Sequence, residues 1–102
     1  MKLLTKEIRS KLPPLYSQEE KEAKDVMVIV KFFTPWSYWT WYATEFDGED
    51  IFFGYVVGPC PELGTFSLKE LESVTGALGL KIERDLHYQP QTLEEVMNKQ
   101  PA

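Results

Sequence analysis

The only histidine of the chain lies in a run of alternating ionisable residues. Glu83, Asp85 and His87 are spaced two residues apart, and in a β-strand this spacing places side chains on one face of the sheet. Two carboxylates and an imidazole on one face could bind a metal ion or transfer protons, so one alternative function is metal-dependent hydrolysis. The same pattern is also typical of an edge segment whose charges pair with one another, and we favour that interpretation.

A denser cluster of charge lies at residues 45–50. The string Asp47-Gly48-Glu49-Asp50 predicts a hairpin turn. It is too short for a calcium loop, which needs about twelve residues with ligands at set spacings, so we expect no metal there. The acidic turn could keep two hydrophobic strands soluble, or it could face a basic protein partner.

Nucleophilic catalysis has little support in the sequence. Cys60 lies between two prolines, and nothing in the sequence brings a base or oxyanion donors to it. There is no Gly-x-Ser-x-Gly motif and no phosphate-binding glycine loop. We therefore predict no catalytic residue and no cofactor, and a chain that is not an enzyme. A single cysteine also excludes an internal disulfide, which fits a reducing compartment.

Aromatic residues are concentrated in residues 31–58, which hold all three tryptophans and five of the six phenylalanines. Such side chains can stack on the bases of single-stranded nucleic acid, but that mechanism also needs interleaved Lys and Arg. Residues 32–62 contain no basic residue, so single-stranded nucleic-acid binding is kept only as an alternative and core packing is favoured. Trp36, in a loop beside Pro35, is expected to be the most exposed tryptophan and an anchor for a protein partner. The residues predicted to contact that partner are Glu45, Asp47, Glu49, Asp50, Glu62 and Trp36.

Three β-branched and aromatic runs predict an antiparallel meander with strands over residues 26–33, 38–46 and 51–57. Strict alternation along the second strand would put Trp41, Ala43 and Glu45 on one face and Tyr42, Thr44 and Phe46 on the other. Gly54 indicates a bulge or a close backbone approach in the third strand. Short strands are also expected near residues 63–66 and 82–88.

Helix-capping patterns begin at Thr5, Ser67 and Thr92. They predict short helices over residues 6–11, from 68 to before Gly76, and over 93–98, whereas residues 17–25 are interpreted as a charged loop or a frayed helix. The predicted fold class is α+β: a small antiparallel sheet of about three to five strands with two or three short helices packed on it.

The 102 residues are expected to form a single domain. Its parts are an N-terminal helix and charged segment (1–25), the β-meander core (26–66), and a helix, short strand and C-terminal helix (67–102). The net charge of −5 opposes binding to a phosphate backbone. The sequence shows no targeting signal and no apolar run of roughly 18 residues, so we expect a cytoplasmic location.

Several strings of the sequence resemble a known family. They lie at residues 31–35, 39–45, 47–54, 62–64, 67–72 and 79–86. Over residues 4–90 they resemble the bacterial and mobile-element family known as domain of unknown function 2958. That family is similar to proteins encoded on plasmids, integrative elements and phages, and some relatives resemble inhibitors of type II CRISPR–Cas9. The family has no established catalytic residues, so the resemblance implies none here.

The resemblance, together with the small size and acidic charge, leads to one main hypothesis. We expect an accessory protein of a mobile element that binds, and thereby counters, a host defence nuclease such as Cas9. It could mimic DNA and occupy a basic channel through its acidic residues, or it could dock through a hydrophobic patch near Trp36. We expect a monomer or a weak dimer, because a sheet edge could stay open, and no direct contact with nucleic acid or membrane.

Overall fold

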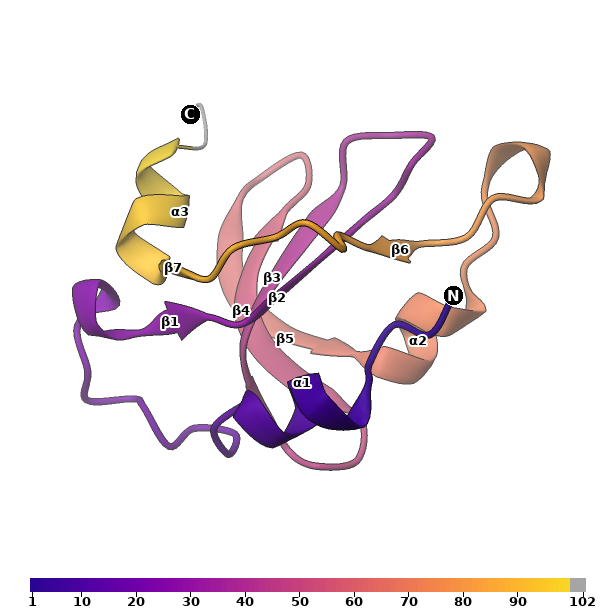
Figure 1. Ribbon diagram of the computed structural model, residues 1–102. Coiled ribbons are helices and arrows are strands. Elements are labelled where there is room, and N and C mark those ends of the chain that lie inside the picture. Colours follow the sequence, from indigo (N-terminus) through magenta and orange to yellow (C-terminus); the bar gives the residue numbers. More distant parts are fainter. Residues whose placement is uncertain (100–102) are drawn as a thin grey trace.

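Residues 1–99 are described by the computed structural model, and they form an antiparallel five-stranded sheet flanked by short helices (Figure 1). The strand order is β5-β4-β3-β2-β6, and β1 and β7 form a separate two-stranded sheet. The predicted α+β class is therefore confirmed. The strands are β1 (Met27–Val28), β2 (Val30–Phe33), β3 (Thr40–Phe46), β4 (Ile51–Val57), β5 (Glu62–Ser67), β6 (Glu83–Arg84) and β7 (Gln91–Thr92). The helices are α1 (Lys6–Lys11), α2 (Leu68–Ser73) and α3 (Leu93–Lys99), with 3-10 turns η1 (Ala23–Asp25) and η2 (Ala77–Gly79).

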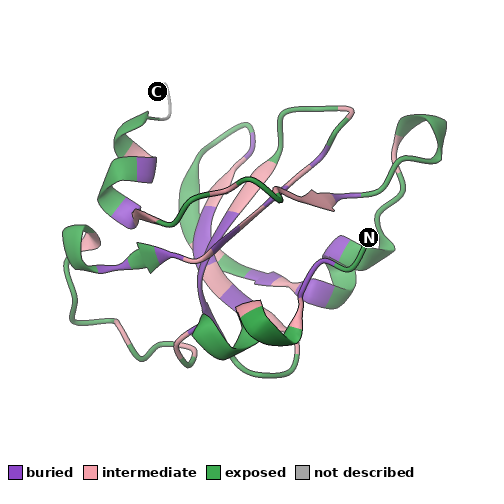
Figure 2. Cartoon of the chain, viewed as in Figure 1, coloured by how far each residue is buried: buried purple, intermediate pink, exposed green. Residues whose placement is uncertain are grey.

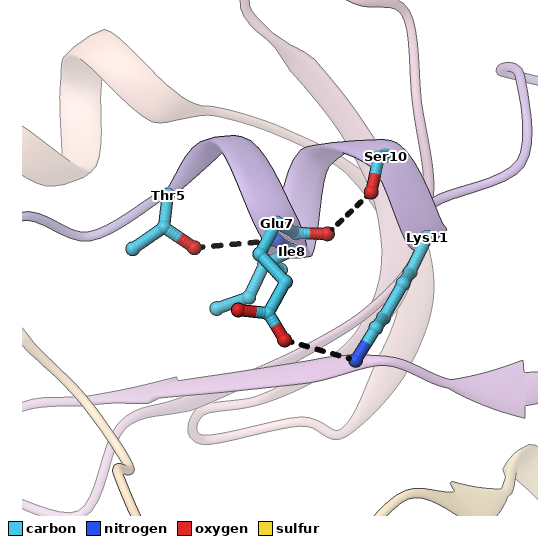
Figure 3. A network of polar contacts seen from close by, with 5 residues as sticks. All are labelled: Thr5, Glu7, Ile8, Ser10 and Lys11. Atoms are coloured by element: carbon cyan, nitrogen blue, oxygen red, sulfur yellow. Dashed lines mark hydrogen bonds and ion pairs between the residues drawn. The ribbon is translucent and has the colours of Figure 1, made fainter.

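Helix α1 is short and is held by local contacts (Figure 3). Thr5 Oγ1 accepts a hydrogen bond from the backbone N–H of Ile8 at 3.2 Å, and Ser10 Oγ donates to the carbonyl oxygen of Glu7 at 2.7 Å. Lys11 Nζ lies 3.5 Å from the Glu7 carboxylate in solvent, so that ion pair adds little stability. The helix contacts the sheet through Ile8, which packs against the core, and through Arg9, which lies over the Phe46 ring.

The other two helices begin with the predicted caps. Ser67 Oγ accepts from the N–H of Glu70, and Thr92 Oγ1 accepts from the N–H of Glu95. In α3 the Glu95 carboxylate also accepts from the N–H of Thr92, which completes a capping box. The first N–H groups of a helix have no partner within the helix, and these side chains supply one. All three helices predicted from capping patterns are confirmed.

A β-bulge in β3 changes which side chains share a face. Ala43 pairs with Gly54 and Glu45 pairs with Phe53, so the register shifts at Thr44. Alternation restarts after the bulge, and Glu45 lies on the face of Tyr42 instead of the face of Ala43. The strict alternation expected from the sequence is therefore wrong beyond residue 43. The extra residue itself could not be read from a run of seven strand-forming residues.

Gly54 marks a close backbone approach at the same place. A Cβ atom built on Gly54 would lie 1.9 Å from the carbonyl oxygen of Tyr42, a distance that no side chain can tolerate. The prediction of a close approach at this glycine is confirmed, and the bulge lies opposite, in β3.

Each face of the sheet carries its own core, and Figure 2 shows buried residues along the central strands and in α2 and α3. Helices α1 and α2 and the N-terminal residues cover one face, and α3 with η1 covers the other. The first core contains Leu3, Leu4, Leu12, Val30, Phe32, Ala43, Phe46, Phe52, Phe66, Leu68, Leu71 and Ile82. The second core contains Val26, Val28, Tyr42, Tyr55, Leu93 and Val96.

The predicted strand at 26–33 is wrong as a single element. It divides at Ile29: β2 stays in the main sheet, whereas β1 pairs with β7. That pairing is what brings α3 onto the second face, because α3 follows β7 directly.

The last predicted strand, 82–88, is reduced to Glu83–Arg84. None of the helices within residues 1–99 has the length and the apolar composition that a bilayer-spanning helix needs.

Candidate partner-binding surface

The acidic turn between β3 and β4 is organised by its own carboxylates. One oxygen of Asp47, Oδ1, accepts hydrogen bonds from the backbone N–H groups of Glu49, Asp50 and Ile51 at 2.8–3.0 Å. The N–H groups of Asp50 and Glu49 hold the pKa of the Asp47 carboxyl below its usual value of 3.8. Gly48 has a φ of +91°, which glycine adopts without strain. Asp47 therefore builds the predicted hairpin turn, which is confirmed.

Asp50 connects this turn to helix α2. Its Oδ2 accepts from the Ser67 hydroxyl at 2.6 Å, and its Oδ1 accepts from the N–H of Lys69 at 2.8 Å. Both hydrogen bonds hold the pKa of the Asp50 carboxyl below its usual value, and the bond from the Ser67 hydroxyl has a larger effect than the bond from the Lys69 N–H. Arg9 also reaches the turn and donates to the carbonyl oxygen of Gly48 at 2.7 Å. These contacts use much of the turn's acceptor capacity within the fold.

Glu45 does not lie on the surface. Only 4% of the residue is exposed, and its carboxylate accepts from the backbone N–H groups of Tyr16 (2.6 Å) and Gln18 (3.2 Å) and from the Gln18 side chain (3.2 Å). Because it is buried, Glu45 cannot contribute to an exposed acidic patch. It instead holds the 14–18 segment against the sheet, where Tyr16 takes a φ of +64°.

The remaining two acidic candidates lie at opposite ends of the sheet. Glu49 and Glu62 are both exposed. Ser67 pairs with Ile51 beside the turn, whereas Glu62 pairs with Val56 five residues along, and a strand advances about 3.4 Å per residue. Some 17 Å of strand therefore separates Glu62 from the turn. The structure does not bring the six predicted partner-binding residues together.

Trp36 is half-buried, so the expectation that it is the most exposed tryptophan is wrong. It packs against the first core, and a Cβ on Gly76 would lie 2.1 Å from its ring. The absent side chain of Gly76 lets the 74–80 loop lie against this indole. The most exposed tryptophan is Trp39, at 36%, whose ring stacks on Trp41 with the centroids 5.8 Å apart.

The loop from residue 74 to 80 presents apolar side chains to solvent. Leu78 is 98% exposed, and its backbone is left-handed, with φ at 59°. Hydrogen bonds hold the loop in shape: the N–H of Gly76 donates to Leu80 O at 2.7 Å, and Lys81 Nζ donates to Thr75 Oγ1 at 2.6 Å. The loop is therefore ordered by its own hydrogen bonds, and the side chain of Leu78 points away from both cores.

The contact between Trp36 and Gly76 brings the β2–β3 loop against the 74–80 loop, and we call the exposed apolar residues of these two loops the two-loop surface. Its exposed apolar residues are Tyr38 and Trp39 from the β2–β3 loop and Val74, Leu78 and Leu80 from the 74–80 loop. Sequence reasoning missed the second loop. The available signal was the string Gly76-Ala-Leu-Gly-Leu, in which apolar residues lie between glycines and outside any predicted element.

The run at residues 83–87, for which metal chemistry was only the alternative to paired charges, is held as a turn. Asp85 Oδ1 accepts from the N–H of His87, and Asp85 Oδ2 lies 3.7 Å from Lys31 Nζ. Glu83 is in β6, and Asp85 and His87 have left the strand, so the three side chains do not share a strand face. Across residues 1–99, no group of three or more His, Cys, Asp or Glu side chains is arranged to hold a metal ion.

The structure is that of a small α+β protein with exposed apolar side chains on two neighbouring loops. The chain belongs to the family described as "Protein of unknown function (DUF2958)", which matches residues 3–97. No curated protein and no solved structure matches the chain significantly. The resemblance stated from the sequence is therefore confirmed for the family.

Proposed function

We propose that this protein acts by binding another protein through its two-loop surface, as an accessory factor of a mobile genetic element. The proposed target is a host defence nuclease of the Cas9 type, in keeping with the resemblance of some relatives to inhibitors of such nucleases. The proposal is independent of any catalytic residue.

Leu78 is the observation that carries the proposal. A bulky non-glycine residue in the left-handed region is disfavoured by about 1–3 kcal/mol, and Leu78 gains no burial in return, since 98% of it is exposed. A residue that lowers stability and contacts neither core fits a role in binding. Apolar and aromatic anchors that fill a pocket on a partner often dominate the energy of an interface.

Docking through apolar side chains has more support than mimicry of DNA. Mimicry needs carboxylates spaced over one surface, whereas Glu45 is buried and Asp47 and Asp50 accept hydrogen bonds within the fold. The two mechanisms differ in their response to salt. Apolar docking predicts a dissociation constant that changes little between low and physiological salt, and DNA mimicry predicts a steep rise.

The test uses purified Cas9–guide complex and the variant Leu78→Asn. Asparagine accepts the left-handed conformation more readily than leucine, so the fold should be at least as stable, while the apolar anchor is lost. We expect binding measured by biolayer interferometry to weaken at least about tenfold, as for an interface hot spot, and inhibition of DNA cleavage to fall with it.

Leu86→Asn is the matched control, because Leu86 is 63% exposed but lies outside the two-loop surface. It should leave binding and inhibition unchanged. If the wild-type protein neither binds the nuclease complex nor inhibits cleavage, the proposal of a Cas9-type target is refuted. If Leu78→Asn binds as tightly as the wild-type protein, the two-loop surface is excluded as the binding site.

A further inference from the structure

A pocket opens on the second face of the sheet, away from the two-loop surface. Its volume is about 320 Å³, which is at the lower end for small-molecule sites. Phe53 and Leu63 from β4 and β5 and Leu93 and Met97 from α3 give it apolar walls. The 16–21 segment closes another side, and Glu45 is among the lining residues.

Glu45 brings a buried carboxylate to this pocket, and no cation in the described part of the chain lies within ion-pair distance of it. The ion pairs among residues 1–99 are Lys11–Glu7, Lys24–Glu22 and Lys31–Asp85, and none includes Glu45. Its three hydrogen-bond donors are neutral amide N–H groups. A buried carboxylate is strongly disfavoured without compensation, and neutral donors compensate it less than a cation does.

The carboxylate also has acceptor capacity left. A carboxylate offers about four lone-pair sites. Oε2 accepts two hydrogen bonds, both from Gln18, whereas Oε1 accepts only one, from the Tyr16 N–H. Oε1 therefore has a lone-pair site that no hydrogen bond of the fold uses.

We propose that this pocket binds a small organic ammonium ion, with its charged nitrogen on Glu45 and its apolar body against Phe53, Leu63 and Met97. The ammonium group supplies a positive charge in direct contact with the carboxylate and a donor for Oε1. The apolar body matches the walls: an apolar cavity of about 150 Å³ is enough for benzene, and this pocket is roughly twice that size. An aryl-alkyl monoamine has the required charge and volume.

The test is an NMR titration of the whole chain with 2-phenylethylammonium. The amide signals of Tyr16 and Gln18 are the local readout, because these N–H groups donate to Glu45. We expect saturable shifts at these amides. The uncharged analogue 2-phenylethanol should bind at least about tenfold more weakly, which corresponds to about 1.4 kcal/mol, and the anion 3-phenylpropanoate should not bind.

Two variants locate the site. Leu63 lies at the rim of the pocket and is 48% exposed, so the larger side chain of Leu63→Trp should fill the pocket. This variant should abolish the shifts while the rest of the spectrum stays native. Lys21→Gln removes a like charge from the pocket lining and should tighten amine binding by roughly two- to fivefold. Glu62→Gln, a carboxylate change on β5 outside the lining, is the control and should change nothing.

Three results with the aryl amine would each overturn the proposal. They are no saturable shift with the amine at millimolar concentration, equal affinity for amine and alcohol, and unchanged binding by Leu63→Trp. The second would make the pocket an apolar site in which Glu45 only holds the 14–18 segment. A lysine analogue, N-acetyl-lysine methylamide, separates the sources of the ammonium group: binding tighter than that of the aryl amine would assign the pocket to a protein side chain and overturn the small-molecule ligand.

Discussion

The residues that matter most in this molecule are carboxylates that serve the fold. Asp47, Asp50 and Glu45 were each predicted to face a partner, because sequence shows charge but not hydrogen-bond geometry. Asp47 instead satisfies three backbone N–H groups, and Asp50 joins the turn to α2. The position of Glu45 followed from the bulge at Thr44, which no residue type in β3 signals.

Acid should destabilise the fold through the two turn carboxylates. The pKa values of Asp47 and Asp50 are lowered in the folded state, so the folded protein binds these protons less readily than the unfolded chain. Their stabilising contribution is therefore complete above the unfolded pKa near 3.8 and is lost as pH falls through the lower folded values. Urea unfolding at pH 6, 4 and 2.5 measures this loss. Asp47→Asn should flatten the dependence, and an unchanged slope would contradict the assignment.

Loss of the Glu45 carboxylate should lower the stability of the protein by much more than the loss of an exposed carboxylate. Glu45→Ala removes the acceptor of the part-buried N–H groups of Tyr16 and Gln18, and a donor left unsatisfied in a fully buried place costs about 1–3 kcal/mol, which sets the upper bound for each. Chemical denaturation should show a lower midpoint with a similar m-value. Glu49→Ala, which alters an exposed carboxylate in the neighbouring turn, should leave the midpoint nearly unchanged.

At the scale of elements, the sequence predicted the parts that depend on local chemistry. The three helix caps, the hairpin at residues 47–50 and the meander of β2, β3 and β4 follow from nearest neighbours in the chain. The division of residues 26–33 at Ile29 could not be predicted, because it depends on β7, some sixty residues away. The extent of β6 is likewise set by its partner β2.

The pair Gly54 and Gly64 offers a sharp test of the sheet. They face one another across β4 and β5, but a Cβ on Gly54 would lie 1.9 Å from Tyr42 O, whereas a Cβ on Gly64 meets nothing within 4 Å. Gly54→Ala should therefore prevent folding or lower stability by more than about 3 kcal/mol, since β3 and β4 must move apart. Gly64→Ala should be close to neutral. Circular dichroism and thermal melts distinguish them, and equal behaviour would refute the close approach.

At the scale of the whole molecule, one sheet joins two cores. Phe32, Ala43 and Phe52 face one core, whereas Tyr42 and Tyr55, from the same strands, face the other. Neither core can lose its packing without exposing the sheet that supports the other. The molecule should therefore unfold as a single cooperative unit, as small domains usually do.

Leu93→Ala tests this cooperativity from the second core. Leu93 is 6% exposed, and its truncation should lower stability by about 2–5 kcal/mol. Trp36 and Trp41 pack against the first core, so their fluorescence reports the opposite face. We expect the fluorescence and far-ultraviolet transitions to shift together to the same lower midpoint. A fluorescence transition that stays at the wild-type midpoint would mean that the two cores unfold independently.

The turn at Cys60 gives the molecule a built-in place for a reporter. Cys60 is the only cysteine of the chain and is exposed, and it follows Gly58, over which the Trp39 ring lies. A maleimide dye would therefore attach at a single known position without any engineered mutation. Because tryptophan quenches many dyes on contact, brightness would change whenever a partner repositions Trp39, and docking at the two-loop surface could be followed in real time in an unmodified sequence.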